Sequence, residues 1–164
     1  MNNFIRKGLA VCFGSLMTAA IVAPVAAEEI QLSEQAAVAE IEIDRGPEEL
    51  QAVLRPRPDL DTTDTALVFN NALHKTAVVR CVAFGANGHA LGRVRIKIPG
   101  NGLRFIRASD LANGLDFIGS ARCSARGKIV PSAFIVGRIL TDTPAKAAFD
   151  WPVTRMRFPA IATF

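Results

Sequence analysis

The sequence predicts an all-β fold: a single antiparallel β-sandwich of the immunoglobulin-like kind over residues 65–140. Three observations support this. Apolar and polar residues alternate with a period of two from Thr65 onward, turn signals separate these runs at regular spacing, and no helical pattern lies between them. Because strands do not alternate with helices, a parallel α/β fold is not expected.

Residues 1–27 have the pattern of a secretory signal peptide. Arg6 and Lys7 supply the positive charges, an apolar run follows over residues 8–22, and a small-residue cleavage site lies at residues 25–27. The alternative is an uncleaved membrane anchor, since the apolar run approaches spanning length. We expect cleavage and export to the periplasm or the extracellular space, with no transmembrane span in the mature chain.

Residues 28–64 are expected to be an acidic leader that is partly helical or disordered, and mobile or loosely packed. They contain eleven acidic and three basic residues, whereas residues 65–164 contain four acidic and fourteen basic residues. Within the leader, Glu40–Asp44 alternates like a strand, and Pro47–Leu54 resembles a short helix with proline in its first turn. The charge asymmetry indicates an anionic partner or a pairing of the two parts with each other.

The strands of the predicted sandwich are bounded by Gly, Asn and Pro residues, which favour turns. The expected strands cover residues 66–69, 76–84, 91–99, 103–108, 116–124 and 128–140. The second and third form a hairpin around Asn87-Gly88, which favours a tight turn. Pro131 suggests an edge or a bulge in the sixth. Residues 141–164 are expected to form a C-terminal tail, in which residues 153–156 can add a last edge strand.

Two cysteines, Cys81 and Cys123, remain once the predicted signal peptide with Cys12 is removed. An even pair in an exported protein favours a structural disulfide, and two buried thiols are the alternative. The sequence has no C-x-x-C motif and no spacing typical of a metal site, so neither a metal nor a cofactor is expected.

The order of strands and turns resembles small bacterial β-sandwiches, including the sensory rhodopsin transducer family. The resemblance rests on the runs Leu67–Asn71, Val78–Phe84, Asn87-Gly88, Arg93–Pro99 and Ser109–Leu111. It implies the fold alone, because no binding or catalytic motif matches. The signal peptide and the cysteine pair also depart from that family, which is cytoplasmic.

A basic strand face is the main functional indication. Arg93, Arg95 and Lys97 alternate with the inward-facing Val94, Ile96 and Ile98. The candidate binding residues are Arg93, Arg95, Lys97, Arg104 and Arg107, and Arg122 can extend the patch. The expected partner is an anionic envelope component or an acidic protein surface. Nucleic acid is not expected, because no aromatic residues interleave with these cations.

Two alternatives for this face stay open: ordinary solvated charges that protect sheet edges, or a patch covered by the acidic leader itself. We therefore expect an exported, non-enzymatic binding or assembly module with no catalytic residues. The first alternative function is a small envelope enzyme that uses His74 or His89 near a carboxylate. The second is a structural subunit that forms homo-oligomers through an exposed edge strand.

Overall fold

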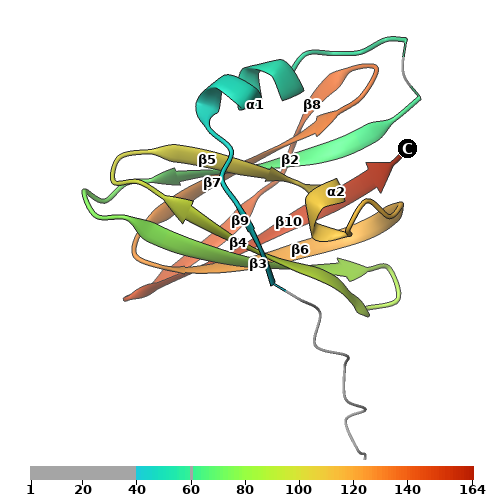
Figure 1. Ribbon diagram of the computed structural model, residues 1–164. Coiled ribbons are helices and arrows are strands. Elements are labelled where there is room, and N and C mark those ends of the chain that lie inside the picture. Colours follow the sequence, from blue (N-terminus) through green and yellow to red (C-terminus); the bar gives the residue numbers. More distant parts are fainter. Residues whose placement is uncertain (1–39, 60) are drawn as a thin grey trace, which may run out of the picture. The chain divides into compact units, whose positions relative to one another are not determined.

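The computed structural model describes residues 40–59 and 61–164, which belong to one compact unit. The predicted signal peptide, residues 1–27, lies outside the described residues. The all-β prediction is confirmed, because ten strands form one sheet and the described residues add only two short helices (Figure 1). The elements are β1 (Glu40–Ile43), α1 (Pro47–Val53), β2 (Thr63–Asn71), β3 (Ala77–Gly85), β4 (Ala90–Ile98), β5 (Leu103–Arg107), α2 (Ala108–Leu111), β6 (Phe117–Arg126), β7 (Ile129–Val136), β8 (Leu140–Thr143), β9 (Lys146–Asp150) and β10 (Val153–Thr163).

The strands follow the order β1-β4-β3-β6-β10-β2-β7-β8, with β5 also paired to β2 and β9 also paired to β10. The sheet is mixed rather than purely antiparallel. The parallel pair is β1 with β4, in which Glu40 lies opposite Arg93 and Ile43 lies opposite Ile96. This parallel pair departs from the predicted antiparallel sandwich. Tight turns join neighbouring strands in antiparallel pairs, whereas β1 comes from the predicted leader and reaches β4 through a long connection.

The C-terminal strand β10 lies inside the sheet, so the expectation of an edge strand over residues 153–156 is wrong. It pairs with β6 along Val153–Ala162, with β9 over Val153–Arg157, and with β2 at Ala162 and Thr163. Pro159, which interrupts the alternating pattern in the sequence, falls beyond the end of β9. At Pro159, β10 has β6 on one side and no strand on the other, because β9 pairs only as far as Arg157. Proline lacks the N–H group that would be needed to pair with a second strand, so this position tolerates it.

One long expected strand is divided in two. Residues 128–140 form β7 and the start of β8, which are antiparallel and joined at Gly137–Ile139. Pro131 lies where β7 pairs with β2 alone, since β8 pairs with β7 over Ala133–Val136. The edge character expected for Pro131 is confirmed at this position.

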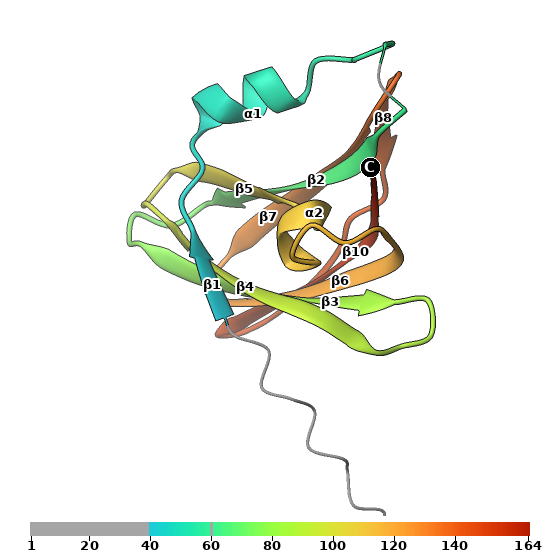
Figure 2. The same cartoon turned by 45° about the vertical axis from the view of Figure 1, so that its right-hand side comes forward.

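The sheet folds over on itself, so that strands from its two halves contribute to one core. Phe69 of β2 and Phe158 of β10 meet edge to face with their ring centroids 5.7 Å apart. In Figure 2, α2 lies between the part of the sheet that contains β2, β5 and β7 and the part that contains β3, β4 and β6. Gly92 permits this close packing, because a Cβ there would lie 1.7 Å from the carbonyl oxygen of Leu111.

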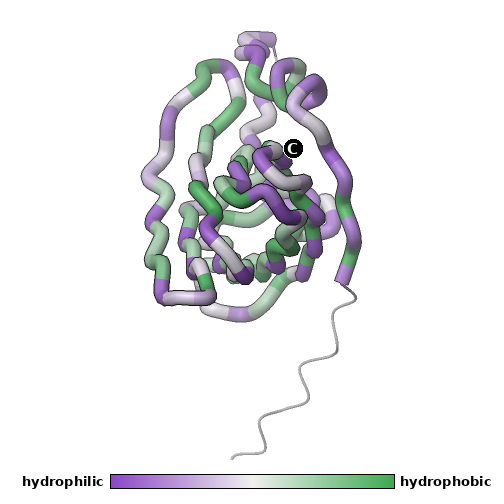
Figure 3. The backbone as a smooth tube through the Cα atoms, turned by 90° about the vertical axis from the view of Figure 1, so that its left-hand side faces the viewer, coloured by the Kyte–Doolittle hydropathy of each residue, from purple (hydrophilic) through white to green (hydrophobic). Residues whose placement is uncertain are grey.

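The period-two alternation expected from the sequence is present along the strands, as the alternating hydropathy in Figure 3 shows. On β4, Val94, Ile96 and Ile98 are buried and the residues between them are more exposed. The inward direction predicted for these three apolar side chains is therefore confirmed. Burial of one such side chain contributes about 1.5–3 kcal/mol, before the cost of chain ordering.

The predicted leader contributes two elements to this unit. Its expected strand and short helix are confirmed as β1 and α1. Leu50 of α1 is buried with Phe105 and Val68 in a second apolar cluster, on the face of β2 and β5 that points away from the main core. Residues 40–53 are therefore packed on the sheet, and the expectation of a mobile leader does not hold for them.

Candidate functional site

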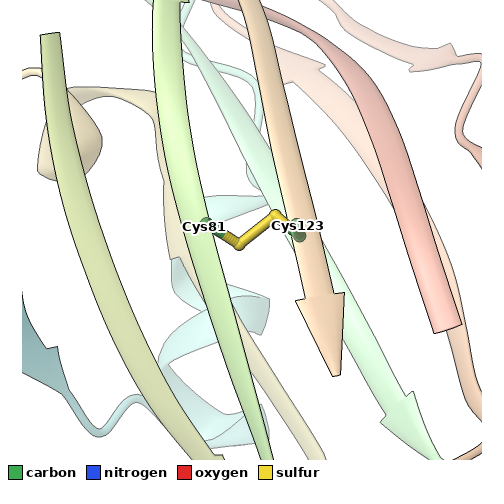
Figure 4. Close-up of a disulfide and its surroundings, with 2 residues drawn as sticks. All are labelled: Cys81 and Cys123. Carbon is green, nitrogen blue, oxygen red and sulfur yellow. A yellow bond between two sulfur atoms is a disulfide. The ribbon is translucent and has the colours of Figure 1, made fainter. Parts of the chain in front are cut away.

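A disulfide joins β3 to β6. Cys81 and Cys123 lie directly opposite each other on these antiparallel strands, with their Cα atoms 4.1 Å apart (Figure 4). Both cysteines are buried and belong to the main core. The predicted disulfide is confirmed, and because its sulfurs face the core it acts as a structural link beneath the sheet surface.

The opposite surface of these strands is the candidate site. We call it the outer face: the surface of β4, β3, β6, β10 and β9 that points away from the main core. On β6, Ala121, Cys123 and Ala125 point into the core, whereas Arg122 and Ser124 are exposed on the outer face. The same alternation holds on β10, where Met156 and Phe158 are buried while Arg155 and Arg157 are exposed. Neighbouring strands lie about 4.8 Å apart, so cations on this face are close to one another.

The leader supplies carboxylates to one part of the outer face. Glu40 and Glu42 of β1 form ion pairs with Arg80 and Lys97, at 3.5 Å between Glu40 Oε1 and Arg80 Nε and 2.7 Å between Glu42 Oε1 and Lys97 Nζ. Lys97 donates a hydrogen bond to Glu42 and attracts its charge, which lowers the pKa of Glu42 below its ordinary value. We call Arg80 and Lys97 the covered cations.

A second part of the outer face holds three cations in a line across three strands. Arg122 of β6 lies opposite Arg157 of β10, and Arg157 lies opposite Lys146 of β9. Within residues 40–59 and 61–164, no carboxylate lies within 4.0 Å of a charged nitrogen of these three side chains. We call Arg122, Arg157 and Lys146 the basic row. Like charges directly opposite each other destabilise a sheet, so this arrangement has an energetic cost.

The basic row borders a shallow depression of about 730 Å³ in the outer face. Val82 and Phe84 of β3 and Ala148 of β9 give it apolar surface, and the guanidinium of Arg122 lies 4.9 Å from the centre of the Phe84 ring. Its lining includes no carboxylate, and its cations are Arg80, Arg122, Lys146, Arg155 and Arg157. Val82 and Phe84 are only partly buried, so this side of β3 is open to solvent.

The five predicted binding residues do not form one patch. Arg93, Arg95 and Lys97 share the outer face of β4, whereas Arg104 and Arg107 lie on β5, which pairs with β2. Arg104 donates a hydrogen bond of 2.7 Å to Asp44, and Arg107 forms an ion pair of 3.6 Å with Asp110. Arg122 does lie on the outer face, as the sequence suggested.

Sequence reasoning missed Lys146, Arg155 and Arg157 as site residues, because they lie in the segment interpreted as a tail. The signal was present: Arg155 and Arg157 alternate with the apolar Met156 and Phe158. That alternation has the same period of two that identified the strand at residues 91–99. Pro159 interrupts this alternation directly after Phe158, so the pattern is short.

The two histidines proposed for an enzyme are exposed and lie in different places. His74 Nδ1 is 2.9 Å from the side-chain nitrogen of Asn101. In the part of the chain that the structure describes, neither histidine is hydrogen-bonded or ion-paired to a carboxylate, and no three His, Cys, Asp or Glu side chains are grouped as metal ligands. Over the same residues, no helix is long and apolar enough to cross a membrane.

Asp64 is a partly buried carboxyl whose oxygens are already bonded. It accepts hydrogen bonds from the backbone N–H groups of Thr65 and Ser109, and from Ser109 Oγ at 2.6 Å. Burial raises the pKa of Asp64 above its ordinary value, while the bonds from Ser109 oppose that shift. Because these bonds join β2 to α2, the carboxyl has a structural role that accounts for its position.

Comparison with known proteins gives no match: no protein-family model, no curated protein and no solved structure matches the chain. The resemblance to the sensory rhodopsin transducer family therefore stays a prediction about the fold.

Proposed function

We propose that this protein is a non-enzymatic binding module that holds an anionic partner on the outer face of its sheet. The observation that carries the proposal is the basic row: three cations directly opposite one another on adjacent strands, with no carboxylate of the described residues paired to them. A bound anion would relieve the repulsion within the row and form charge-assisted hydrogen bonds with it.

The covered cations strengthen the proposal by contrast. Arg80 lies directly opposite Arg95 on β4, but Glu40 of β1 pairs with Arg80 and Glu42 pairs with Lys97. The leader therefore supplies counter-charges where β1 reaches. The strands of the basic row lie further along the sheet, with β6 third, β10 fourth and β9 fifth in order from β1. An external anion is the natural counter-charge for the row.

We also infer that the protein is exported after cleavage of residues 1–27, and that its partner is a component of the cell envelope or an acidic protein surface. The buried disulfide supports an oxidising compartment. The shared core between the two halves of the sheet supports a sandwich-type arrangement, and immunoglobulin-like connectivity stays a prediction.

A soluble polyanion without acyl chains tests the proposal. Binding of dextran sulfate is measured by titration for the wild type and for the variant Arg122→Ser/Arg157→Ser/Lys146→Ser. Each surface cation contributes about 1 kcal/mol near an anionic surface, so the triple variant should bind about 100-fold more weakly.

The matched control is Arg55→Ser/Arg57→Ser/Lys75→Ser, which removes the same charge from exposed positions away from the row. This control should retain most of the affinity, and wild-type binding should weaken as salt is added. Equal losses in the two triple variants would mean that net charge, rather than the basic row, accounts for binding. No binding by the wild type would contradict the proposal directly.

A further inference from the structure

An exposed aromatic pair lies on the β9–β10 hairpin, the same hairpin that carries two residues of the basic row. Trp151 is 77% exposed and Phe149 is 48% exposed. Their rings meet edge to face with centroids 6.1 Å apart. Large apolar side chains are costly to expose to water. Two adjacent ones at the end of a hairpin therefore indicate a surface that becomes buried when a partner binds.

Cations and one carboxylate lie around this aromatic pair. Asp150 stands between Phe149 and Trp151 in the chain, and Arg155 on the same hairpin forms an ion pair of 3.7 Å with it. Arg126 on β6 lies opposite Val153, the first residue of β10 after the hairpin turn. The turn between β6 and β7 is fixed beside the hairpin by a hydrogen bond of 2.8 Å from the Gly127 N–H to the Pro152 carbonyl, which brings exposed Lys128 to the same end of the molecule. Arg126 and Lys128 therefore add positive charge beside the exposed aromatic rings, whereas Arg155 is paired with Asp150.

Resting on the proposed function, we propose that the anionic partner is a lipid surface, and that the β9–β10 hairpin docks on it by inserting Trp151 and Phe149 between the headgroups. Tryptophan favours the membrane–water interface, where its ring is apolar and its N–H group finds a polar partner. The basic row and the neighbouring arginines would face the anionic headgroups. An acidic polymer accounts for the charge but offers no apolar layer for the aromatic pair.

The chain contains one tryptophan, so its intrinsic fluorescence reports on Trp151 alone. The protein is mixed with vesicles of phosphatidylcholine and phosphatidylglycerol, or with vesicles of phosphatidylcholine alone. We expect the emission to shift to shorter wavelength with the anionic vesicles only, and the shift to disappear in the triple serine variant of the basic row. Co-sedimentation with the same vesicles measures binding independently of fluorescence.

The variant Phe149→Ser/Trp151→Ser should lose vesicle binding by about tenfold or more, while it keeps the wild-type affinity for dextran sulfate. Its matched control, Leu115→Ser/Ile139→Ser, removes two other exposed apolar side chains and should bind vesicles normally.

Binding to dextran sulfate without binding to anionic vesicles would overturn the lipid proposal and leave the proposed function standing. An unshifted tryptophan on bound protein, or equal binding to neutral vesicles, would also overturn it. Failure of the wild type to bind dextran sulfate would instead contradict the proposed function.

Discussion

The outer face of this sheet has two basic regions that differ in their counter-charges. Around β4 and β3, Lys97 and Arg80 are paired with glutamates of β1. On β6, β10 and β9, the residues of the basic row have no such partner within the described residues. In both regions the cations alternate with core residues along the strands, on β3 and β4 in the first and on β6 and β10 in the second.

The comparison separates charges that complete the fold from charges that are available for binding. Arg80 and Lys97 already have a carboxylate of β1, so an external anion must compete with it. The cations of the basic row have no carboxylate partner among the described residues, so an external anion meets no such competitor there. The sequence alone could not make this distinction, because Arg93, Arg95 and Lys97 form the most regular basic pattern in the chain although Lys97 is already paired.

The largest expected effect concerns the link between the two regions, since the disulfide joins β3 to β6. Replacing both Cys81 and Cys123 by alanine should lower the free energy of unfolding by about 4 kcal/mol, because the bond closes a loop with a sequence separation of 42 residues. Denaturant unfolding measures this loss. Reduction of the wild type under the same conditions should give a similar loss, and a change below about 1 kcal/mol in both experiments would contradict a stabilising role.

The next effect tests whether β1 restrains the covered cations. The variant Glu40→Gln/Glu42→Gln frees Arg80 and Lys97, so we expect its affinity for dextran sulfate to rise by about tenfold. The control Glu48→Gln/Glu49→Gln changes the net charge equally on α1, where both side chains are exposed. The control should change the affinity much less. An equal rise in the two variants would show that β1 does not compete with the partner.

A smaller effect should appear in stability without any ligand. Replacing Arg157 by threonine removes the centre of the basic row and should raise the free energy of unfolding by about 0.5 kcal/mol, because like charges on adjacent strands repel each other. The same replacement at Arg80 removes an ion pair with Glu40 and should be neutral or slightly destabilising. Denaturant unfolding at low salt measures both variants, and identical changes would show that the two regions do not differ in repulsion.

The smallest expected effect depends on pH. The pKa of Glu42 is lowered from its ordinary value of 4.5 by Lys97, so the stabilising pair is complete above pH 4.5 and is lost as the pH falls through the lowered folded value. Protonation of Glu42 frees Lys97, whereas the sulfate groups of the probe stay charged. Wild-type affinity should therefore rise by about twofold in acid relative to the variant Glu42→Gln, as measured by titration at several pH values. A constant ratio between the two proteins would contradict this role for Glu42.

Much of the fold was predictable from local patterns. The hairpin around Asn87-Gly88, the disulfide between Cys81 and Cys123, and the short helix beginning at Pro47 each depend on a few neighbouring residues or on a residue type with one common use. The central position of β10 was not predictable in the same way. Pro159 interrupts its pattern, and two of its neighbours, β6 and β2, come from distant parts of the sequence.

The candidate site was only partly predictable for a related reason. Its residues are aligned by cross-strand register, and a single sequence does not show which strands are neighbours. Arg122 was named because its own strand was clear. Arg157 and Lys146 were missed because the basic row becomes visible only after β9 and β10 are placed beside β6.

The most direct test of the central claim locates the bound anion on the protein. Backbone amide chemical shifts of the isotope-labelled wild type are followed by NMR during titration with dextran sulfate. We predict that the largest changes centre on Arg122, Arg157 and Lys146. Changes centred instead on Arg104 and Arg107 of β5, or spread evenly over all exposed cations, would contradict the assignment of binding to the basic row.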